Sequence, residues 1–195
     1  MNNYEYIIAS LPVLQPDGRE NLDCGAILEE IRERLDGRDA ESLDFLLSGF
    51  DGEGLDADFY RRAGRQRSRF LREYFAYDRL ARNTKVEFLN RSLGRPEGTD
   101  LVLLNEDEDL HPDGREELDA VLGQEDILGR ERGLDGLMWR KIDEITVMDV
   151  FSLDLILGFA AKLRITGRWL QLDEGTGREL FRKLVKEIKE NYKTI

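Results

Sequence analysis

The segment Val150–Leu172 constrains the fold of this 195-residue chain more than any other part of the sequence. Its apolar residues recur at helical spacing, but they cover nearly the whole circumference of the helix: Leu153, Ile156, Leu157, Ala160, Ala161, Leu163 and Trp169. A helix that is apolar on all sides needs protein around it, so we expect it at the centre of a bundle. Asp154, Lys162 and Arg164 interrupt the segment, which favours a core helix over a membrane span.

Amphipathic patterns on both sides of this segment predict further helices, and the four prolines of the chain leave room for long ones. The predicted ranges are about 23–35, 39–49, 58–93, 114–122 and 125–147, and a last helix begins between residues 173 and 176. Residues 4–11 fit either a short helix or a strand.

The expected N-caps are Asn21 or Asp23 for the first of these helices and Asp149 or Ser152 for the central one. Gly37 is the expected C-terminal stop of the first helix. Gly64 and the pair Asn83-Thr84 are the weak points of the longest helix, which runs from Asp58 to Leu93.

We therefore expect an all-α fold, a multi-helix bundle with a long basic helix and a buried hydrophobic C-terminal helix. The length fits a single helical domain, 1–195, and two sub-lobes, 1–95 and 96–195, are the alternative.

The net charge of −12 argues against nonspecific nucleic-acid binding, because the phosphate backbone would be repelled. The charge is uneven, however, since residues 61–95 carry 11 basic and 3 acidic side chains between two strongly acidic blocks. This basic block is either a docking face for an acidic partner or the internal counterpart of the acidic blocks, and the sequence leaves both interpretations open.

The single Cys24 cannot form an internal disulfide and suits a reducing compartment. Met1-Asn2-Asn3 lacks the basic start of a secretory signal, and no apolar run is long enough to span a bilayer. These features predict a cytoplasmic protein.

No constellation of residues predicts catalysis, a cofactor or a metal. His111 is the only histidine and lies in the acidic loop 106–112, where an exposed, incidental histidine is expected. A calcium loop beginning at Asp109 would lack its bidentate carboxylate, because Ala120 occupies the twelfth position. Gly94-Arg95-Pro96-Glu97-Gly98 lacks the Lys-Ser/Thr of a phosphate-binding loop.

Four stretches carry a family resemblance. The opening Tyr4-Glu5-Tyr6-Ile7-Ile8-Ala9-Ser10-Leu11-Pro12 resembles the start of the bacterial DUF2764 family. Phe151-Ser152-Leu153, Ala160-Ala161-Lys162-Leu163 and Arg168-Trp169 resemble its C-terminal part. The family is associated with V-type (A/V-type) ATPase gene clusters, so the resemblance implies a stalk or accessory subunit of a proton- or sodium-translocating rotary ATPase. Its counterpart would be the all-helical C/d-type stalk protein, which seats the central shaft on the membrane rotor ring.

From this resemblance we expect a non-catalytic cytoplasmic subunit or assembly factor, peripheral to the inner membrane through other V-type ATPase subunits and monomeric in isolation. The residues expected to contact these partners are Tyr4, Tyr6, Leu11, Arg61, Arg62, Arg65, Arg69 and Arg72. The alternatives are a small-molecule-binding or enzymatic helical domain that uses the acidic loop around His111, and a self-associating scaffold.

Overall fold

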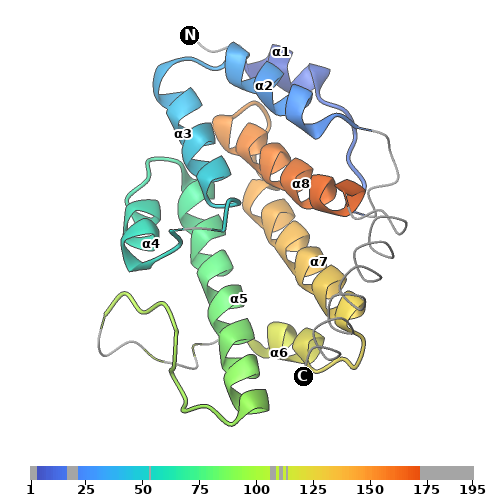
Figure 1. Ribbon diagram of the computed structural model, residues 1–195. Helices are drawn as coiled ribbons and strands as arrows, with labels where there is room; N and C mark the ends of the chain where they lie inside the picture. The colour runs from blue at the N-terminus through green and yellow to red at the C-terminus, as the bar shows by residue number, and fades with distance from the viewer. Residues whose placement is uncertain are drawn as a thin grey trace, which may run out of the picture.

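A computed structural model describes residues 4–16, 22–52, 54–105, 109, 112 and 114–171, which form eight helices and no strand (Figure 1). The helices are α1 (Tyr4–Ser10), α2 (Cys24–Arg34), α3 (Gly37–Ser48), α4 (Ala57–Gly64), α5 (Arg69–Leu93), α6 (Glu116–Leu122), α7 (Ile127–Thr146) and α8 (Leu153–Gln171). This confirms the all-α fold and shows that the opening segment is a helix. The helix expected after residue 173 lies outside the described residues.

Helix α8 occupies the centre of the bundle, as its sequence predicts. It packs against α1, α2, α3, α5 and α7, and Figure 1 shows it between the α1–α2 pair and α7. Ile156, Leu157 and Leu163 are fully buried along it. Gly158 permits the close approach of α7, because a Cβ there would lie only 2.9 Å from the Thr146 side chain. No described helix is both long enough and apolar enough to cross a membrane.

Aromatic side chains fill the space where α3, α4 and α5 meet. Phe45 of α3 stacks on Phe59 of α4 with ring centroids 5.1 Å apart, and Phe59 meets Phe75 of α5 edge to face at 5.0 Å. Such pairs contribute beyond the area that they bury. This cluster holds the short helix α4 against α5.

One predicted helix is wrong, because the expected helix from Asp58 to Leu93 consists of two helices separated at residues 65–68. Ser68 starts α5 as its N-cap, with its Oγ accepting from the Leu71 amide at 3.1 Å. The Arg72 guanidinium donates to the carbonyls of Gln66, Arg67 and Ser68 in the connection. These side-chain bonds satisfy the backbone groups that a continuous helix would have paired internally.

Some of the other helix boundaries lie at the expected capping residues, and others do not. Asp23 caps α2 and Ser152 caps α8, whereas Asp149 binds Arg69 instead. Gly37 does not stop α2, which ends at Arg34; it begins α3 with a φ of +47°, a conformation that favours glycine.

Helix α5 continues without a break through Asn83-Thr84, and its polar side chains bind the chain segment that returns along it. The Asn83 amide exchanges two hydrogen bonds of 3.0 Å with the backbone of Val102. Asn90 donates to the Thr99 carbonyl at 2.7 Å, and the buried Glu87 carboxylate accepts from the Gly98 amide at 3.2 Å. Residues 98–102 are thus held along α5 by side chains at helical spacing.

Candidate functional site

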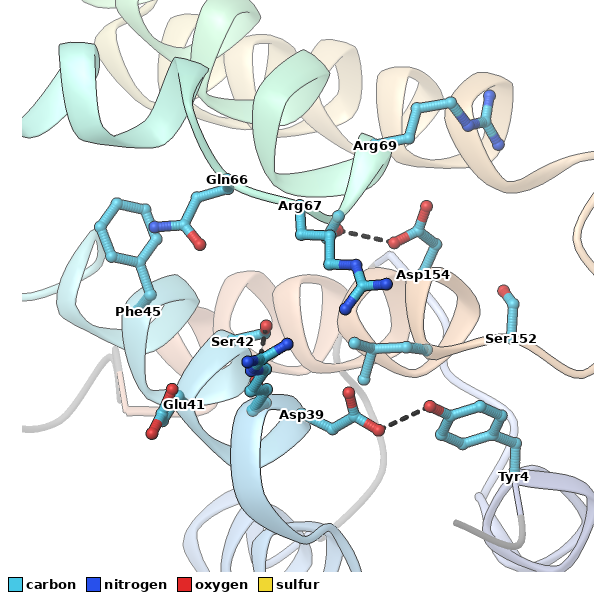
Figure 2. Close-up of a pocket in the computed structure, with 13 residues that line it drawn as sticks. Tyr4, Asp39, Glu41, Ser42, Phe45, Gln66, Arg67, Arg69, Ser152 and Asp154 are labelled. Carbon is cyan, nitrogen blue, oxygen red and sulfur yellow. Dashed lines mark hydrogen bonds between the residues drawn. The ribbon is translucent and has the colours of Figure 1, made fainter. Parts of the chain in front are cut away.

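A large pocket lies where α1, α3, the α4–α5 connection and the start of α8 come together (Figure 2). Its volume is about 850 Å³, and it is lined by Tyr4, Arg38, Asp39, Glu41, Ser42, Phe45, Gln66, Arg67, Ser68, Arg69, Ser152, Leu153 and Asp154. Widely separated stretches of sequence therefore build one pocket, and most of the residues that line it are of polar or charged types.

Asp154 joins the starts of α5 and α8 at the pocket wall. Its carboxylate accepts from the Ser68 hydroxyl at 2.6 Å and from the Phe70 amide at 3.2 Å. A carboxylate at the N-terminus of α5 satisfies free amides and interacts favourably with the helix dipole. The negative charge of Asp154 is therefore engaged by the protein itself.

Asp39 closes the opposite wall. The Tyr4 hydroxyl of α1 donates to its carboxylate at 2.6 Å, which ties α1 to the first turn of α3. Figure 2 shows this pair at one edge of the pocket and the Glu41 carboxylate directed away from its middle. Two of the three lining carboxylates therefore have partners inside the fold.

The lining arginines differ in how they are bound. Arg69 is fixed, since it donates to the Ile145 carbonyl at 2.7 Å and to Asp149 at 2.9 Å. Arg38 and Arg67 make no ion pair with any described carboxylate, and both are exposed. Figure 2 shows the Arg67 guanidinium extending into the middle of the pocket. The pocket thus presents cationic groups without described ionic partners to an incoming group.

The structure brings two of the residues predicted for partner contacts to this pocket, Tyr4 and Arg69. Tyr6 is 63% exposed, with the Arg34 guanidinium 5.2 Å from its ring centroid. Leu11 lies instead in an apolar groove of about 280 Å³ between α1, α7 and α8. None of these placements tests partner binding, which stays a prediction.

The other predicted contact residues serve local structure or lie exposed. Arg61 pairs with Asp58 and reaches the Leu104 carbonyl, and the Arg62 guanidinium lies over Phe45 and Phe59. Arg65 is exposed directly after α4, and Arg72 organises the α4–α5 connection. The basic block therefore lies on two helices, not along one helical face.

Many charges of the basic block meet acidic residues of the same chain. Ion pairs join Arg82 to Asp78, Lys85 to Glu131, Arg91 to Glu87 and Arg95 to Asp100. Internal neutralisation thus accounts for much of the block beyond residue 79. Arg65 and Arg67, near the α4–α5 connection, are not part of these described pairs.

A buried polar group lies between α4 and α5. The Tyr60 hydroxyl donates to Asp78 at 2.7 Å, and the same carboxylate oxygen accepts from Arg82 at 2.8 Å. Burial is the main cause that raises the pKa of Tyr60, and the negative charge of Asp78 raises it further. Because every member has a partner, this group stabilises the α4–α5 packing.

His111 lies outside the described residues. A pocket of about 210 Å³ borders the same loop, with Asp109 and Pro112 facing Asn83 and Thr84 of α5. Within the described ranges, no three His, Cys, Asp or Glu side chains form a group that could hold a metal ion.

Sequence reasoning missed Arg38, Ser68 and Asp154 as members of the pocket. Their own patterns are ordinary, since each occupies the start of a helix where polar residues are common. The run of arginines at 61–72 indicates a cationic surface in this part of the chain. It does not show that residue 67 lies in the same pocket as residues 38 and 154.

Comparison with known proteins gives one match. A family model described as a protein of unknown function, DUF2764, matches residues 52–192. This range contains the stretches 151–153, 160–163 and 168–169, and it leaves out residues 4–12. No curated protein matches the chain, and neither does any solved structure.

Proposed function

Because this chain belongs to the DUF2764 family, we propose that it is a non-catalytic cytoplasmic subunit or assembly factor of a bacterial V-type rotary ATPase. A central-stalk coupling protein of the C/d type is the specific form of the proposal. Family membership carries it, since proteins that this sequence resembles are associated with V-type ATPase gene clusters. Its partners are other ATPase subunits, which keep it peripheral to the inner membrane.

The architecture supports this role in a general way. A coupling or assembly protein needs a body that keeps its shape while its surfaces contact other subunits. Here one buried helix, α8, contacts α1, α2, α3, α5 and α7, so displacing any of these would disturb the packing around it. The surface carries both basic and acidic regions, which suits contacts with several protein partners.

Co-purification tests the proposal. We expect the tagged chain, expressed at its natural level, to bring down rotary ATPase subunits from gently solubilised membranes, whereas an unrelated acidic protein with the same tag does not. Deleting the gene should lower the yield of intact ATPase and ATP-driven ion transport into membrane vesicles. An eluate without ATPase subunits, together with normal assembly in the deletion strain, contradicts the proposal.

The pocket beside the acidic loop gives the small-molecule alternative a defined test. If His111 carried chemistry there, His111→Ala would abolish turnover or ligand binding. We expect His111→Ala to leave both ATPase co-purification and ion transport within twofold of wild type. A turnover or ligand-binding activity that the wild type has and a folded His111→Ala protein lacks would favour the alternative.

A further inference from the structure

The chain segment that follows α5 is held by side chains that bind its main chain. After the C-cap Gly94 the chain turns, and residues 98–104 run back beside α5 toward α4 (Figure 1). We call residues 98–104 the strap. The side-chain amide of Asn83 donates to the Val102 carbonyl and accepts from the Val102 backbone amide, both at 3.0 Å. Asn83 therefore binds this residue as a neighbouring β-strand would, through its main chain.

Four further side chains of α4 and α5 bind main-chain groups of the strap: Arg61 the Leu104 carbonyl at 3.1 Å, Arg79 the Val102 carbonyl at 3.2 Å, Glu87 the Gly98 amide at 3.2 Å and Asn90 the Thr99 carbonyl at 2.7 Å. Residues 79, 83, 87 and 90 recur at helical spacing and therefore lie along one side of α5. We call Arg79, Asn83, Glu87 and Asn90 the backbone-binding row. Every residue except proline provides both main-chain groups, so these hydrogen bonds place little restriction on the sequence of the bound segment.

The deepest side chains of the row are buried, whereas the strap that covers them is not. Glu87 is 2% exposed and Asn90 1%, but every residue of the strap is at least partly exposed. Asp100 also has a φ of +60°, a left-handed conformation that residues other than glycine seldom adopt. Leaving buried polar groups unpaired is costly, so the row requires a main-chain occupant. The strap has no fully buried side chain that would fix it there, and such segments open more readily than the core.

The strap also shows which side chains fit beside the row. Side chains of an extended segment point alternately to opposite sides. Val102 and Leu104 pack against the hydrophobic core, whereas Leu101 and Leu103 line the pocket of about 210 Å³ on α5. An occupant of this site therefore combines an extended main chain with a short apolar run.

We propose that the backbone-binding row is a binding site for an extended, apolar segment of a partner protein, and that the strap is its resident occupant. The partner segment displaces the strap and takes over the same main-chain hydrogen bonds, while its apolar side chains replace those of residues 101–104. The strap thereby limits binding to segments that compete with it. This site goes beyond the proposed function and does not depend on it.

A peptide with the sequence of residues 94–105 tests the site in the purified full-length protein. Val102→Pro in the chain removes the backbone amide that donates to Asn83, so it weakens the strap and leaves the row intact. In this background Asn83→Ala removes the amide group from the row. Ser92→Ala is the matched control, because the exposed Ser92 hydroxyl donates to the Phe88 carbonyl of its own helix. Fluorescence anisotropy measures the affinity for the labelled peptide, and circular dichroism checks that each protein is folded.

We expect Val102→Pro to bind the peptide at least tenfold more tightly than the wild type, whose strap competes with the peptide. Adding Ser92→Ala should leave that affinity unchanged, and adding Asn83→Ala should lower it at least tenfold. A folded Val102→Pro protein that does not bind the peptide, or an affinity that Asn83→Ala leaves unchanged, overturns the site. Because no ATPase subunit takes part in this assay, either failure leaves the proposed function standing.

Hydrogen exchange in the wild type tests the release of the strap without any variant. The Val102 amide should exchange at least tenfold faster than the Leu157 amide in the buried helix α8, because the strap opens while the core stays folded. Equal protection of the two amides would mean that the strap leaves α5 only when the whole protein unfolds, which overturns the proposal.

The mass of the protein in solution separates two sources of the bound segment. A monomeric wild type and a monomeric Val102→Pro protein support a segment from a different protein. A dimer that Asn83→Ala converts to a monomer would mean that the strap of a second copy occupies the row, and this outcome overturns the assignment to a partner protein.

Discussion

At the scale of single residues, the polar group Tyr60–Asp78–Arg82 shows how a buried charge is tolerated. We expect Tyr60→Phe to lower the free energy of unfolding by about 1–3 kcal/mol, because a hydrogen bond to a buried carboxylate is lost without replacement. Urea unfolding followed by circular dichroism measures this change. Tyr77→Phe is the control, since the half-buried Tyr77 hydroxyl makes no hydrogen bond to a described residue and should change stability little. Equal effects of the two variants would contradict this account.

The tyrosines also predict how stability depends on pH. Burial raises the pKa of Tyr60 and that of the fully buried Tyr74 above the ordinary value near 10. A raised pKa means that the folded state holds the proton where the unfolded state has lost it. Stability is therefore unaffected by these groups below about pH 10 and falls as the pH rises beyond it. Unfolding in urea between pH 8 and 11 measures the decline, which Tyr60→Phe should make shallower.

At the scale of helices, the junction of α5 and α8 depends on Ser68. Its hydroxyl caps α5 and donates to Asp154 of α8, so one side chain serves both helices. We expect Ser68→Ala to cost about 1–2 kcal/mol, the upper part of the range for a lost N-cap. Ser92→Ala is the control in the same helix, because the exposed Ser92 hydroxyl only bonds back to the Phe88 carbonyl. Thermal unfolding should show a lower Tm for Ser68→Ala alone.

Helix boundaries were predictable where the deciding interaction is local. Asp23 and Ser152 cap helices that begin one residue later, and each bonds an amide three residues on. The break follows directly after Gly64, an expected weak point, but a full separation over residues 65–68 was not predictable, because it depends on Arg72 binding three carbonyls and on Asp154, which is 86 residues from Ser68. Helix α5 continues through the weak point expected at Asn83, whose partner Val102 lies beyond the end of the helix.

At the scale of the whole molecule, the central position of α8 followed from composition, because a helix apolar on every side has one stable location. The large pocket did not follow from any pattern. Its walls combine Tyr4, Asp39, Arg67 and Asp154, and only the packing of α1, α3 and α5 around α8 brings these positions together. Hydrophobic periodicity thus predicts the fold class. It does not predict the candidate site, which depends on contacts between residues far apart in the sequence.

Residues 1–95 and 96–195 should unfold together as one domain. Helix α8 packs against α1, α2 and α3 from the first part and against α7 from the second, so its loss should affect both. Leu157→Ala at a fully buried position of α8 should cost about 2–5 kcal/mol, whereas Leu93→Ala at an exposed position should cost less than about 0.5 kcal/mol. Fluorescence of Trp139 and Trp169 follows only the second part, and circular dichroism follows every helix. In a single domain both signals change at the same urea concentration, and Leu157→Ala lowers that concentration equally for each. Separate transitions, with only one of them shifted by Leu157→Ala, would show that the two sub-lobes are independent.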